Sequence, residues 1–239
     1  MIIGIDIGGT KIRAVFWNGL KVVRSAEIKT PTNSQEKFGK AVQKIVQIVA
    51  GKEKITKIGI GTAGTVRGTM LIFSPNIPAI KRFNFRKLWP SSVSICVDND
   101  ARCFARGEYI SGAGKNTKSI FAFTIGTGIG RAYGENGKIQ KIKRLEHAEH
   151  WEKEYQHIRS INNDEALAEF LGKNLAPLLT RFKPEVVVIG GGVMKRRGLL
   201  KKIRANLNQK GINAKIRSPR LRENAVALGA ILLASKKNT

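Results

Sequence analysis

The first part of the chain opens with apolar segments separated by glycine turns. An apolar run at 2–7 is followed at once by Gly8-Gly9-Thr10, residues 11–17 alternate between apolar and polar, and Asn18-Gly19 leads into a third run at 20–28. Short runs of this kind, joined by Gly-Gly and Asn-Gly turns, are typical of antiparallel strands. The pattern therefore predicts a three-stranded antiparallel meander.

The same pattern returns in the second half of the chain. A strand-like run at 119–125 ends in Gly126-Thr127-Gly128, a second run covers 129–133, and another Asn-Gly pair follows at Asn136-Gly137. A recurring order of strand, glycine turn and strand indicates that the architecture is duplicated within the chain.

Helices and buried strands are predicted between and after the meanders. Apolar residues recur at helical spacing from the cap residues Asn33-Ser34 up to Gly51, which predicts a helix. Further helices are expected at about 101–110, at 165–182, after 192 and at 224–234, and buried strands at 55–60, 93–97 and 186–189. This alternation predicts the α/β fold class.

The glycine-rich segment Gly112-Ala113-Gly114 separates the two halves and is expected to be a hinge. We predict a first lobe at 1–111 and a second lobe at 112–223. The closing helix, at 224–236, is expected to pack back on the first lobe.

The composition is that of a globular protein with an unusual charge. The 239 residues are 42% hydrophobic, no apolar run approaches the roughly 20 residues that cross a bilayer, and no charged leader is present. We therefore expect a cytoplasmic protein with no membrane partner. The excess of 43 Lys and Arg over 17 Asp and Glu gives a formal charge of +26, which attracts polyanions. However, the most basic stretch, 195–222, has no aromatic residue to stack on bases, so we expect a solvated basic face and no nucleic-acid partner.

Three glycine-rich turns each follow an apolar strand, at Gly8-Gly9-Thr10-Lys11, at Gly126-Thr127-Gly128 and at Gly190-Gly191-Gly192. Backbone N–H groups in such turns can point together at an anion, and glycine permits the close approach that this needs. One such turn alone is more often a tight hairpin. Three in one chain, two of them in matching meanders, predict a site for the phosphates of a nucleotide.

Acidic residues stand at the ends of two predicted strands. Asp6 lies beside the first glycine turn, where its carboxylate can hold Mg²⁺ directly or through water; capping of the turn is the alternative. Asp98-Asn99-Asp100 ends a strand and opens a helix, a position where Asp and Asn are also ordinary helix caps. We predict Asp100 as the base that accepts the proton of an attacking hydroxyl, with Asn99 fixing a neighbouring hydroxyl.

Together these motifs resemble the ROK family (repressor, open reading frame, kinase), which contains bacterial-type glucokinases, other hexose kinases and repressors of the actin and hexokinase superfamily. The resemblance spans nearly the whole chain and rests on motifs in a fixed order: Asp6-Ile7-Gly8-Gly9-Thr10-Lys11, Asp98-Asn99-Asp100-Ala101, Gly126-Thr127-Gly128-Ile129-Gly130, Val188-Ile189-Gly190-Gly191-Gly192-Val193, and the closing helix from Asn224-Ala225 to Gly229-Ala230. It implies two actin-like (ribonuclease H-like) lobes with a nucleotide cleft between them.

The resemblance also assigns roles to residues of this chain. Asp100 resembles the catalytic base, Asn99 a sugar ligand, and the three glycine turns the phosphate loops and the turn beside the adenosine. The loop from Gly61 to Val66, including Gly64, resembles the sugar-side loop, and the segment around Asn76 resembles the one that follows it.

The sequence departs from the family pattern after residue 138. Counting the family's spacing places Glu149 at its sugar-binding Glu and Glu152 at the His that contacts sugar and zinc. The Cys-rich zinc loop is absent, since no Cys follows Cys103. We therefore expect a short, divergent member without structural zinc and with a reshaped acceptor pocket.

The three histidines lie in this divergent region. If they are helical, His147, His150 and His157 share one face. Metal binding by His147 and His150 together with a carboxylate is then one interpretation, but His157 would lie roughly 10 Å from His150, too far to bind the same ion. An exposed, charged helix is the favoured interpretation.

The sequence as a whole predicts an ATP- and Mg²⁺-dependent carbohydrate kinase that acts on a sugar or polyol. Two alternatives stay open: a sugar-sensing regulator without kinase activity, and a phosphotransferase for a non-sugar alcohol or an ATPase with no acceptor. Because the first predicted strand starts at residue 2, we do not expect the helix-turn-helix of the family's repressors in this sequence. The acceptor, the preferred donor and the choice between monomer and homodimer stay open.

Overall fold

The computed structural model describes residues 1–18 and 20–235. Gly19, in the first predicted Asn-Gly turn, and residue 236, the predicted end of the closing helix, lie outside the described residues. The chain forms two compact units, Met1–Gly107 with the segment that starts at Glu223, and Glu108–Arg222. Helix α2 (Asp100–Ser111) contains the first boundary.

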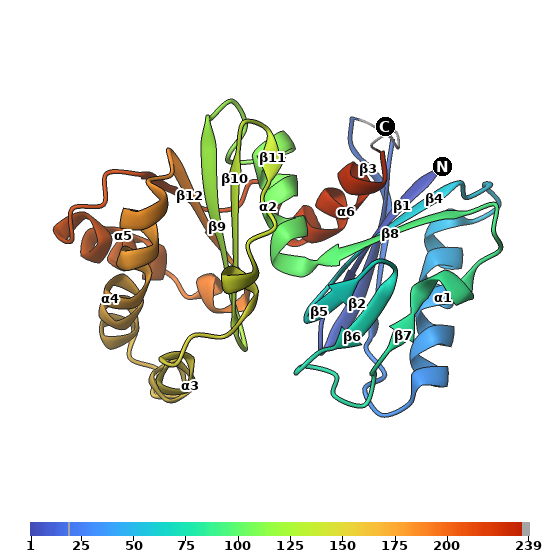
Figure 1. Ribbon diagram of the computed structural model, residues 1–239, viewed down its shortest axis with the longest axis horizontal. Helices are drawn as coiled ribbons and strands as arrows, with labels where there is room; N and C mark the ends of the chain where they lie inside the picture. Colours follow the sequence, from blue (N-terminus) through green and yellow to red (C-terminus); the bar gives the residue numbers. More distant parts are fainter. Residues whose placement is uncertain (19, 236–239) are drawn as a thin grey trace. The chain divides into compact units, whose positions relative to one another are not determined.

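The first unit is built on a five-stranded sheet of order β3-β2-β1-β4-β8 (Figure 1). Its strands are β1 (Ile2–Ile7), β2 (Lys11–Trp17), β3 (Val22–Lys29), β4 (Lys57–Thr62) and β8 (Ser94–Asn99). β1, β2 and β3 pair antiparallel, whereas β1, β4 and β8 pair parallel. The predicted meander is confirmed, although β3 and β4 each begin two residues later than the sequence pattern indicates.

Two helices cover opposite faces of this sheet. Helix α1 (Gln35–Ala50) begins after Ser34, whose side chain accepts a hydrogen bond from the N–H of Lys37, and ends at Gly51. Apolar side chains of α1 pack on Ile3, Ile5 and Ile7 of β1. Because alternate residues of a strand face opposite sides, Gly4 faces the other side, where it meets helix α6 (Ala225–Ser235).

The close packing of α6 depends on two glycines. A Cβ atom on Gly4 would lie 2.0 Å from the carbonyl oxygen of Ala227, and one on Gly59 would lie 2.0 Å from that of Ala230. Neither position has space for a side chain, so α6 lies directly on the backbones of β1 and β4.

A small three-stranded sheet in the first unit has no counterpart in the sequence prediction. It consists of β5 (Thr65–Arg67), β6 (Met70–Phe73) and β7 (Phe83–Asn84), followed by the 3₁₀ turn η1 (Phe85–Leu88). These strands are too short to show a period of two in the sequence.

The second unit repeats the large sheet, in the order β11-β10-β9-β12-β13. Its strands are β9 (Ser119–Ile125), β10 (Ile129–Glu135), β11 (Lys138–Ile139), β12 (Val186–Gly190) and β13 (Lys215–Arg217). The first three pair antiparallel, and β9, β12 and β13 pair parallel. The two sheets share the same succession of antiparallel and parallel pairs, which confirms the predicted duplication.

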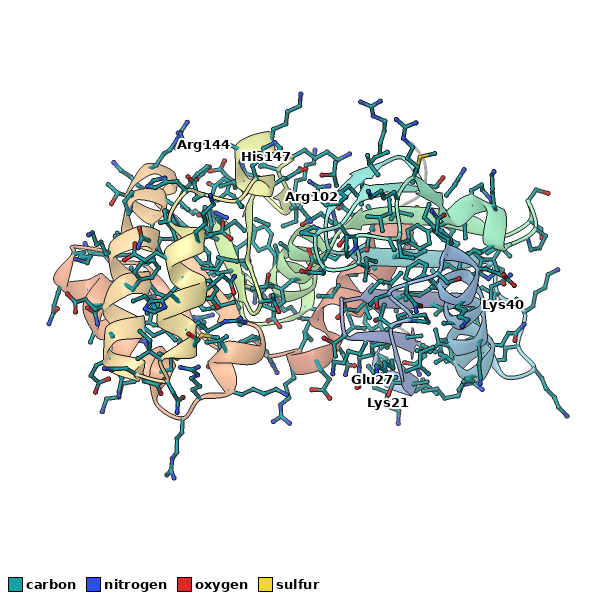
Figure 2. The ribbon with its side chains drawn as sticks, turned by 90° about the horizontal axis from the view of Figure 1, so that it is seen from below. Lys21, Glu27, Lys40, Arg102, Arg144 and His147 are labelled. Atoms are coloured by element: carbon teal, nitrogen blue, oxygen red, sulfur yellow. The ribbon has the colours of Figure 1, made fainter. Side chains whose placement is uncertain are left out.

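Charged side chains extend from the outside of the units, as Lys40 on α1 does (Figure 2).

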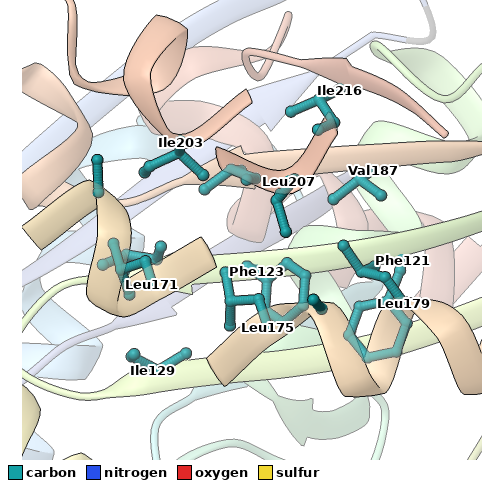
Figure 3. Packing of buried hydrophobic residues seen from close by; sticks show 14 of the residues in the cluster. Phe121, Phe123, Ile129, Leu171, Leu175, Leu179, Val187, Ile203, Leu207 and Ile216 are labelled. Atoms are coloured by element: carbon teal, nitrogen blue, oxygen red, sulfur yellow. The ribbon is translucent and has the colours of Figure 1, made fainter. Parts of the chain in front are cut away.

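The helical segments of the second unit are η2 (Lys143–Glu146), α3 (Glu152–Ser160), α4 (Asp164–Phe182), η3 (Gly192–Lys195) and α5 (Leu199–Gln209), and η4 (Arg222–Asn224) follows. In its core, Leu171, Leu175 and Leu179 of α4 pack against Phe121 and Phe123 of β9 (Figure 3).

The predicted basic helix after Gly192 is divided into η3 and α5. The predicted duplication and the mixed α/β architecture are both present. Among the described residues there is no helix with the length and apolar composition that a bilayer crossing requires.

Candidate active site

Acidic residues of the first unit stand at the carboxyl ends of two parallel strands, β1 and β8. Asp6 in β1 pairs with Gly61 of β4, and Gly61 pairs with Asp98 of β8. Neighbouring strands are about 4.8 Å apart, so β1 and β8 are separated by about 10 Å. Asp100 begins α2 directly after β8. Asp6 and Asp100 are therefore presented at the same edge of the sheet.

The charge of Asp100 acts on the carboxyl group of Asp6. Burial, followed by the negative charge of Asp100, raises the pKa of Asp6 to about 7, while Lys11 and Arg13 oppose this rise. Burial also raises the pKa of Asp100, and the bonds from the N–H of Ala101 and from its own N–H, with the charge of Arg102, act in the opposite direction. The edge therefore holds two desolvated carboxyl groups close enough to repel.

Asp98 differs from Asp100 although only one residue separates them. Its carboxylate is buried and accepts hydrogen bonds from Arg102 Nε at 2.6 Å and from Arg106 Nη2 at 2.7 Å. Both oxygens are thus engaged in a structural ion network, which leaves Asp100 as the candidate base.

Asn99 connects helix α2 to the predicted sugar-side loop. Its side-chain oxygen accepts from the N–H of Ala101 at 3.0 Å and of Arg102 at 3.3 Å, which confirms the capping interpretation for this residue. Its amide nitrogen donates to the carbonyl of Gly64 at 3.2 Å. The structure thus brings together Asn99 and Gly64, two residues predicted to bind substrate.

The first glycine turn lies against the segment around Asn76. The N–H of Gly8 donates to the carbonyl of Lys11 at 3.0 Å, and the hydroxyl of Thr30 donates to the carbonyl of Gly8 at 2.8 Å. A Cβ atom on Gly9 would lie 2.8 Å from the Cβ of Asn76. Glycine is therefore required at residue 9, and Asn76 is placed beside the turn; Thr10 is exposed.

Lys11 does not point freely into solvent. Its ammonium group lies 2.8 Å from Glu27 Oε2, and Arg13 Nη1 lies 3.2 Å from the same oxygen. The Lys11 side chain is half-exposed. A phosphate at the first turn would compete with Glu27 for this cation.

Gly64 has a positive φ of 107°, and a Cβ atom there would lie 2.2 Å from the carbonyl oxygen of Phe73 and 2.8 Å from the Cα of Ser74. Ser74 is fully buried, and its hydroxyl has no hydrogen-bond partner among the described residues. An unpaired buried hydroxyl is costly, and this one lies beneath the backbone of the predicted sugar-side loop at Gly64.

The second unit brings its own two glycine turns together. Gly126-Thr127-Gly128 follows β9, and Gly190 ends the neighbouring parallel strand β12, where it pairs with Thr124. Gly191 has a φ of 103°, and a Cβ atom there would lie 2.3 Å from the carbonyl oxygen of Ile125. The third turn, which continues through Gly192, therefore packs on the last residue of β9.

Glu149 lies in the loop before α3 and is partly exposed. Its N–H donates to Glu152 Oε1 at 2.9 Å, and its carboxylate lies 4.0 Å from Arg144 Nε. Glu152, at the predicted zinc-and-sugar position, forms an ion pair with Arg131. Within 1–18 and 20–235, no three His, Cys, Asp or Glu side chains are grouped to hold a metal ion.

The histidine region differs from the helical prediction. His147 follows η2 in an extended conformation, with φ −100° and ψ 143°, and His150 precedes α3, so only His157 lies in that helix. Arg144 and His147 both belong to the segment before α3 (Figure 2). The three histidines therefore do not share a helix face.

Sequence reasoning did not identify three features of the site. Arg13 of β2 lies opposite Asp6 of β1 in the strand register, and its charge lowers the pKa of Asp6. Ser74 lies against Gly64. One face of α3 contacts the second glycine turn. Only Arg13 had a signal in the sequence, because a basic residue in a strand directly after a glycine turn falls opposite the preceding strand.

Known proteins with similar sequences include carbohydrate kinases, and those with similar structures include both ROK family kinases and a ROK family transcriptional regulator. The chain is 34% identical to the glucokinase of Streptomyces coelicolor over 149 residues, which is 59% of this chain and 45% of that enzyme. It is 32% identical to the N-acetyl-D-glucosamine kinase of Aliivibrio salmonicida over 148 residues, 58% of this chain and 48% of that enzyme. The match thus spans about half the length of these relatives.

The fold matches a solved structure over nearly its full length. The ROK family glucokinase of Streptomyces griseus, in complex with glucose and AMPPNP, superposes with a TM-score of 0.82 at 22% identity, covering 98% of both chains. The actin-like fold is therefore shared.

The model of the ROK family matches residues 2–151 and 141–237, which together include nearly all of the sequence. The predicted family is confirmed: this chain belongs to the ROK family.

Proposed function

We propose that this protein is an ATP- and Mg²⁺-dependent kinase that phosphorylates a hydroxyl group of a sugar or sugar-like acceptor. The observation that carries the proposal is the pair of desolvated carboxyl groups, Asp6 and Asp100, at one edge of the first sheet. Phosphoryl transfer requires a positioned base and neutralisation of charge more than covalent chemistry by the protein. The pair offers one carboxylate for each task.

Asp100 is the proposed base. The raised pKa of its half-buried carboxyl group strengthens it as a proton acceptor. At the same time, its place at the first residue of α2 favours the ionised form through the helix dipole. A carboxylate held in this way can take the proton from an acceptor hydroxyl as the oxygen attacks phosphorus.

Asp6 is the proposed Mg²⁺ ligand, and its environment fits this role. Mg²⁺ in phosphoryl-transfer sites is held by one or two carboxylates, with water and phosphate oxygens completing its shell. The pKa of the half-buried Asp6 carboxyl is raised to about 7 by desolvation and by Asp100, and a nearby cation would stabilise its charged form. When bound, the ion neutralises the phosphate charge that develops during transfer.

The glycine turns supply the proposed phosphate contacts. Gly8, Gly9, Thr10 and Lys11 would hold one part of the triphosphate, Gly126, Thr127 and Gly128 another, and Gly190 to Gly192 would lie beside the nucleoside. The S. griseus relative was solved with AMPPNP, which supports ATP as the donor. For the acceptor we propose contacts from Asn99, Gly64, Asn76 and Glu149.

Formation of ADP in the presence of glucose, N-acetylglucosamine, other sugars and polyols tests the proposal. We expect ADP to accumulate only when an acceptor is present. Asp100→Asn should lower this acceptor-dependent rate about 10²–10⁴-fold, as expected for a general base, and should leave the folding transition in place.

Glu36→Gln is the matched control, because Glu36 is an exposed acid of α1 that pairs with Lys40. It should retain the wild-type rate. ATP hydrolysis that needs no acceptor and survives Asp100→Asn would contradict the kinase proposal and favour an ATPase.

A further inference from the structure

One face of helix α3 is bonded to the backbone of the second glycine turn. Tyr155 Oη donates to the carbonyl of Gly126 at 2.7 Å, and Arg159 Nη1 donates to the same oxygen at 3.0 Å. The side-chain amide of Gln156 donates to the carbonyl of Thr127. Residues 155, 156 and 159 lie on one face of a helix, so α3 meets the turn with a single polar face.

The same face extends to the start of the helix. Glu152 Oε2 accepts a long hydrogen bond from the N–H of Ile129, at 3.4 Å, directly after the turn. Helix α3 therefore contacts both sides of Gly126-Thr127-Gly128.

These contacts determine which way the turn's peptide groups point. In a trans peptide the carbonyl of one residue and the N–H of the next point in opposite directions. Because the carbonyls of Gly126 and Thr127 are directed at α3, the N–H groups of Thr127 and Gly128 are directed away from it. Both residues are exposed, so these two donors face the side where an anion can approach.

Helix α3 is also bonded to the segment that follows the third glycine turn. Arg196 comes directly after η3, which begins at Gly192. Its guanidinium donates to the carbonyl of Arg159 at 2.9 Å and to Asp164 Oδ1 at 3.0 Å. The end of α3 and the segment after the third turn are thus joined by one side chain.

Tyr155 stays a donor throughout the physiological pH range. The residue is fully buried, and burial raises the pKa of its hydroxyl to about 12, against the opposing charges of Arg159 and Arg196. The Arg159 guanidinium lies 5.8 Å from the centroid of the Tyr155 ring. The two donors to Gly126 therefore also support each other.

We propose that α3 is a brace for the phosphate-binding turn, and that Tyr155 and Arg159 are positioning residues that orient the N–H groups of Thr127 and Gly128 toward the donor's phosphates. The inference rests on the proposed function, because it assumes that these N–H groups meet a nucleotide phosphate. It assigns a task to a segment whose charged sequence alone indicates only a solvated helix.

The test compares Tyr155→Phe, Arg159→Met and the double variant with Glu154→Gln, an exposed acid of the same helix outside the bonded face. Binding of AMPPNP with Mg²⁺ is measured by calorimetry, and steady-state rates give the KM for ATP and for the acceptor separately. Hydrogen exchange at Gly126, whose N–H donates to the carbonyl of Gly128 within the turn, is followed without nucleotide, and thermal unfolding reports whether each variant folds.

Each single variant should weaken AMPPNP binding about 3- to 10-fold, the worth of one hydrogen bond, and raise the KM for ATP with little change in the KM for the acceptor. Exchange at Gly126 should become faster, Glu154→Gln should match the wild type, and Arg159→Lys should recover part of the loss. If Tyr155→Phe does not fold, Arg159→Met with Arg159→Lys carries the comparison.

Folded variants that bind AMPPNP as tightly as the wild type would overturn the brace while leaving the kinase proposal intact. Equal losses for ATP and acceptor would also overturn it, because they indicate a general structural effect. A wild-type protein that does not bind AMPPNP would overturn both proposals.

Discussion

Arg131 and Glu152 form an ion pair inside the second unit, with side chains that are 1% and 12% exposed. The Arg131 guanidinium also lies 5.8 Å from the centroid of the Trp151 ring. Its Nε and Nη1 atoms have no hydrogen-bond partner among the described residues. Glu152 has further donors in the N–H groups of Glu149 and Ile129. The buried charge of Arg131 is therefore compensated mainly by Glu152, whereas the Glu152 carboxylate keeps two backbone donors without Arg131.

This asymmetry predicts unequal effects of the two substitutions. Glu152→Ala leaves a buried guanidinium without its counter-ion and should lower the free energy of unfolding by about 3–5 kcal/mol. Arg131→Met should cost less, because the partly exposed Glu152 carboxylate keeps its backbone donors. Urea denaturation of both variants measures the difference.

Glu154→Ala is the matched control for this pair and should leave the free energy of unfolding unchanged, because Glu154 is exposed on the same helix. An Arg131→Met variant that is less stable than Glu152→Ala would contradict the inferred dependence.

Asp98 should make the stability of the first unit sensitive to acid. Burial raises the pKa of Asp98, but the adjacent Arg102 and Arg106 more than offset this and hold it below its ordinary value of 3.8. A carboxyl whose pKa is lower in the folded state stabilises the fold above its unfolded pKa, and this stabilisation is lost as the pH falls through the folded pKa. Asp98→Asn should therefore lower the free energy of unfolding at pH 7 by about 3–5 kcal/mol.

The difference between Asp98→Asn and the wild type should shrink steadily below about pH 4, where the wild-type carboxyl also becomes protonated. Urea denaturation at pH 7 and pH 3 measures both values. Glu36→Gln, at an exposed pair, should show no comparable change. An Asp98→Asn effect of equal size at both pH values would show that the two arginines do not act through the charge of Asp98.

Sequence pattern predicted the parts of the fold that local residues determine. The strands at 2–7 and 119–125, the cap at Ser34 and the end of α1 at Gly51 all follow from the residues at those positions. Duplication was visible because two meanders carry the same turn chemistry. The placement of Asp100 at the first turn of α2 was predictable for the same reason.

Features that depend on distant residues were not predictable in this way. Gly4 and Gly59 are required because the carbonyls of Ala227 and Ala230 approach them. Nothing in the sequence around either glycine indicates that approach. Likewise, the sequence of α3 reads as a charged, solvated helix. The bonded polar face of α3 is defined by the turn at Gly126, 29 residues before Tyr155.

Glu108 holds together two segments of the second unit. Its buried carboxylate accepts from the N–H of Ala113 at 2.7 Å, of Arg220 at 3.1 Å and of Leu221 at 2.9 Å. In Glu108→Gln an amide nitrogen replaces one acceptor, so at least one backbone donor loses its partner. We expect a loss of about 1–3 kcal/mol in the free energy of unfolding.

Hydrogen exchange should localise the effect of Glu108→Gln to Ala113, Arg220 and Leu221, with Glu169→Gln, an exposed acid of α4, as the control. Unchanged exchange at all three amides would show that the carboxylate is not what holds the segments together. The predicted hinge at Gly112-Ala113-Gly114 would then need another source of order.

Glu27, on β3 (Figure 2), should restrain nucleotide binding by holding Lys11. The Lys11–Glu27 pair is half-exposed, and such a pair is worth about 1 kcal/mol or less. Glu27→Gln should therefore leave stability nearly unchanged, but it should release Lys11 and strengthen AMPPNP binding about 2- to 5-fold at low salt, the equivalent of up to about 1 kcal/mol. Lys11→Met should weaken binding, and the gain from Glu27→Gln should be largely lost in the Lys11→Met background. Calorimetry at low and high salt measures all four proteins, and both effects should shrink at high salt because exposed charges are screened. If Glu27→Gln gave the same gain with and without Lys11, the freed cation would be Arg13, which shares the same Glu27 oxygen, and Lys11 would have no part in holding phosphate.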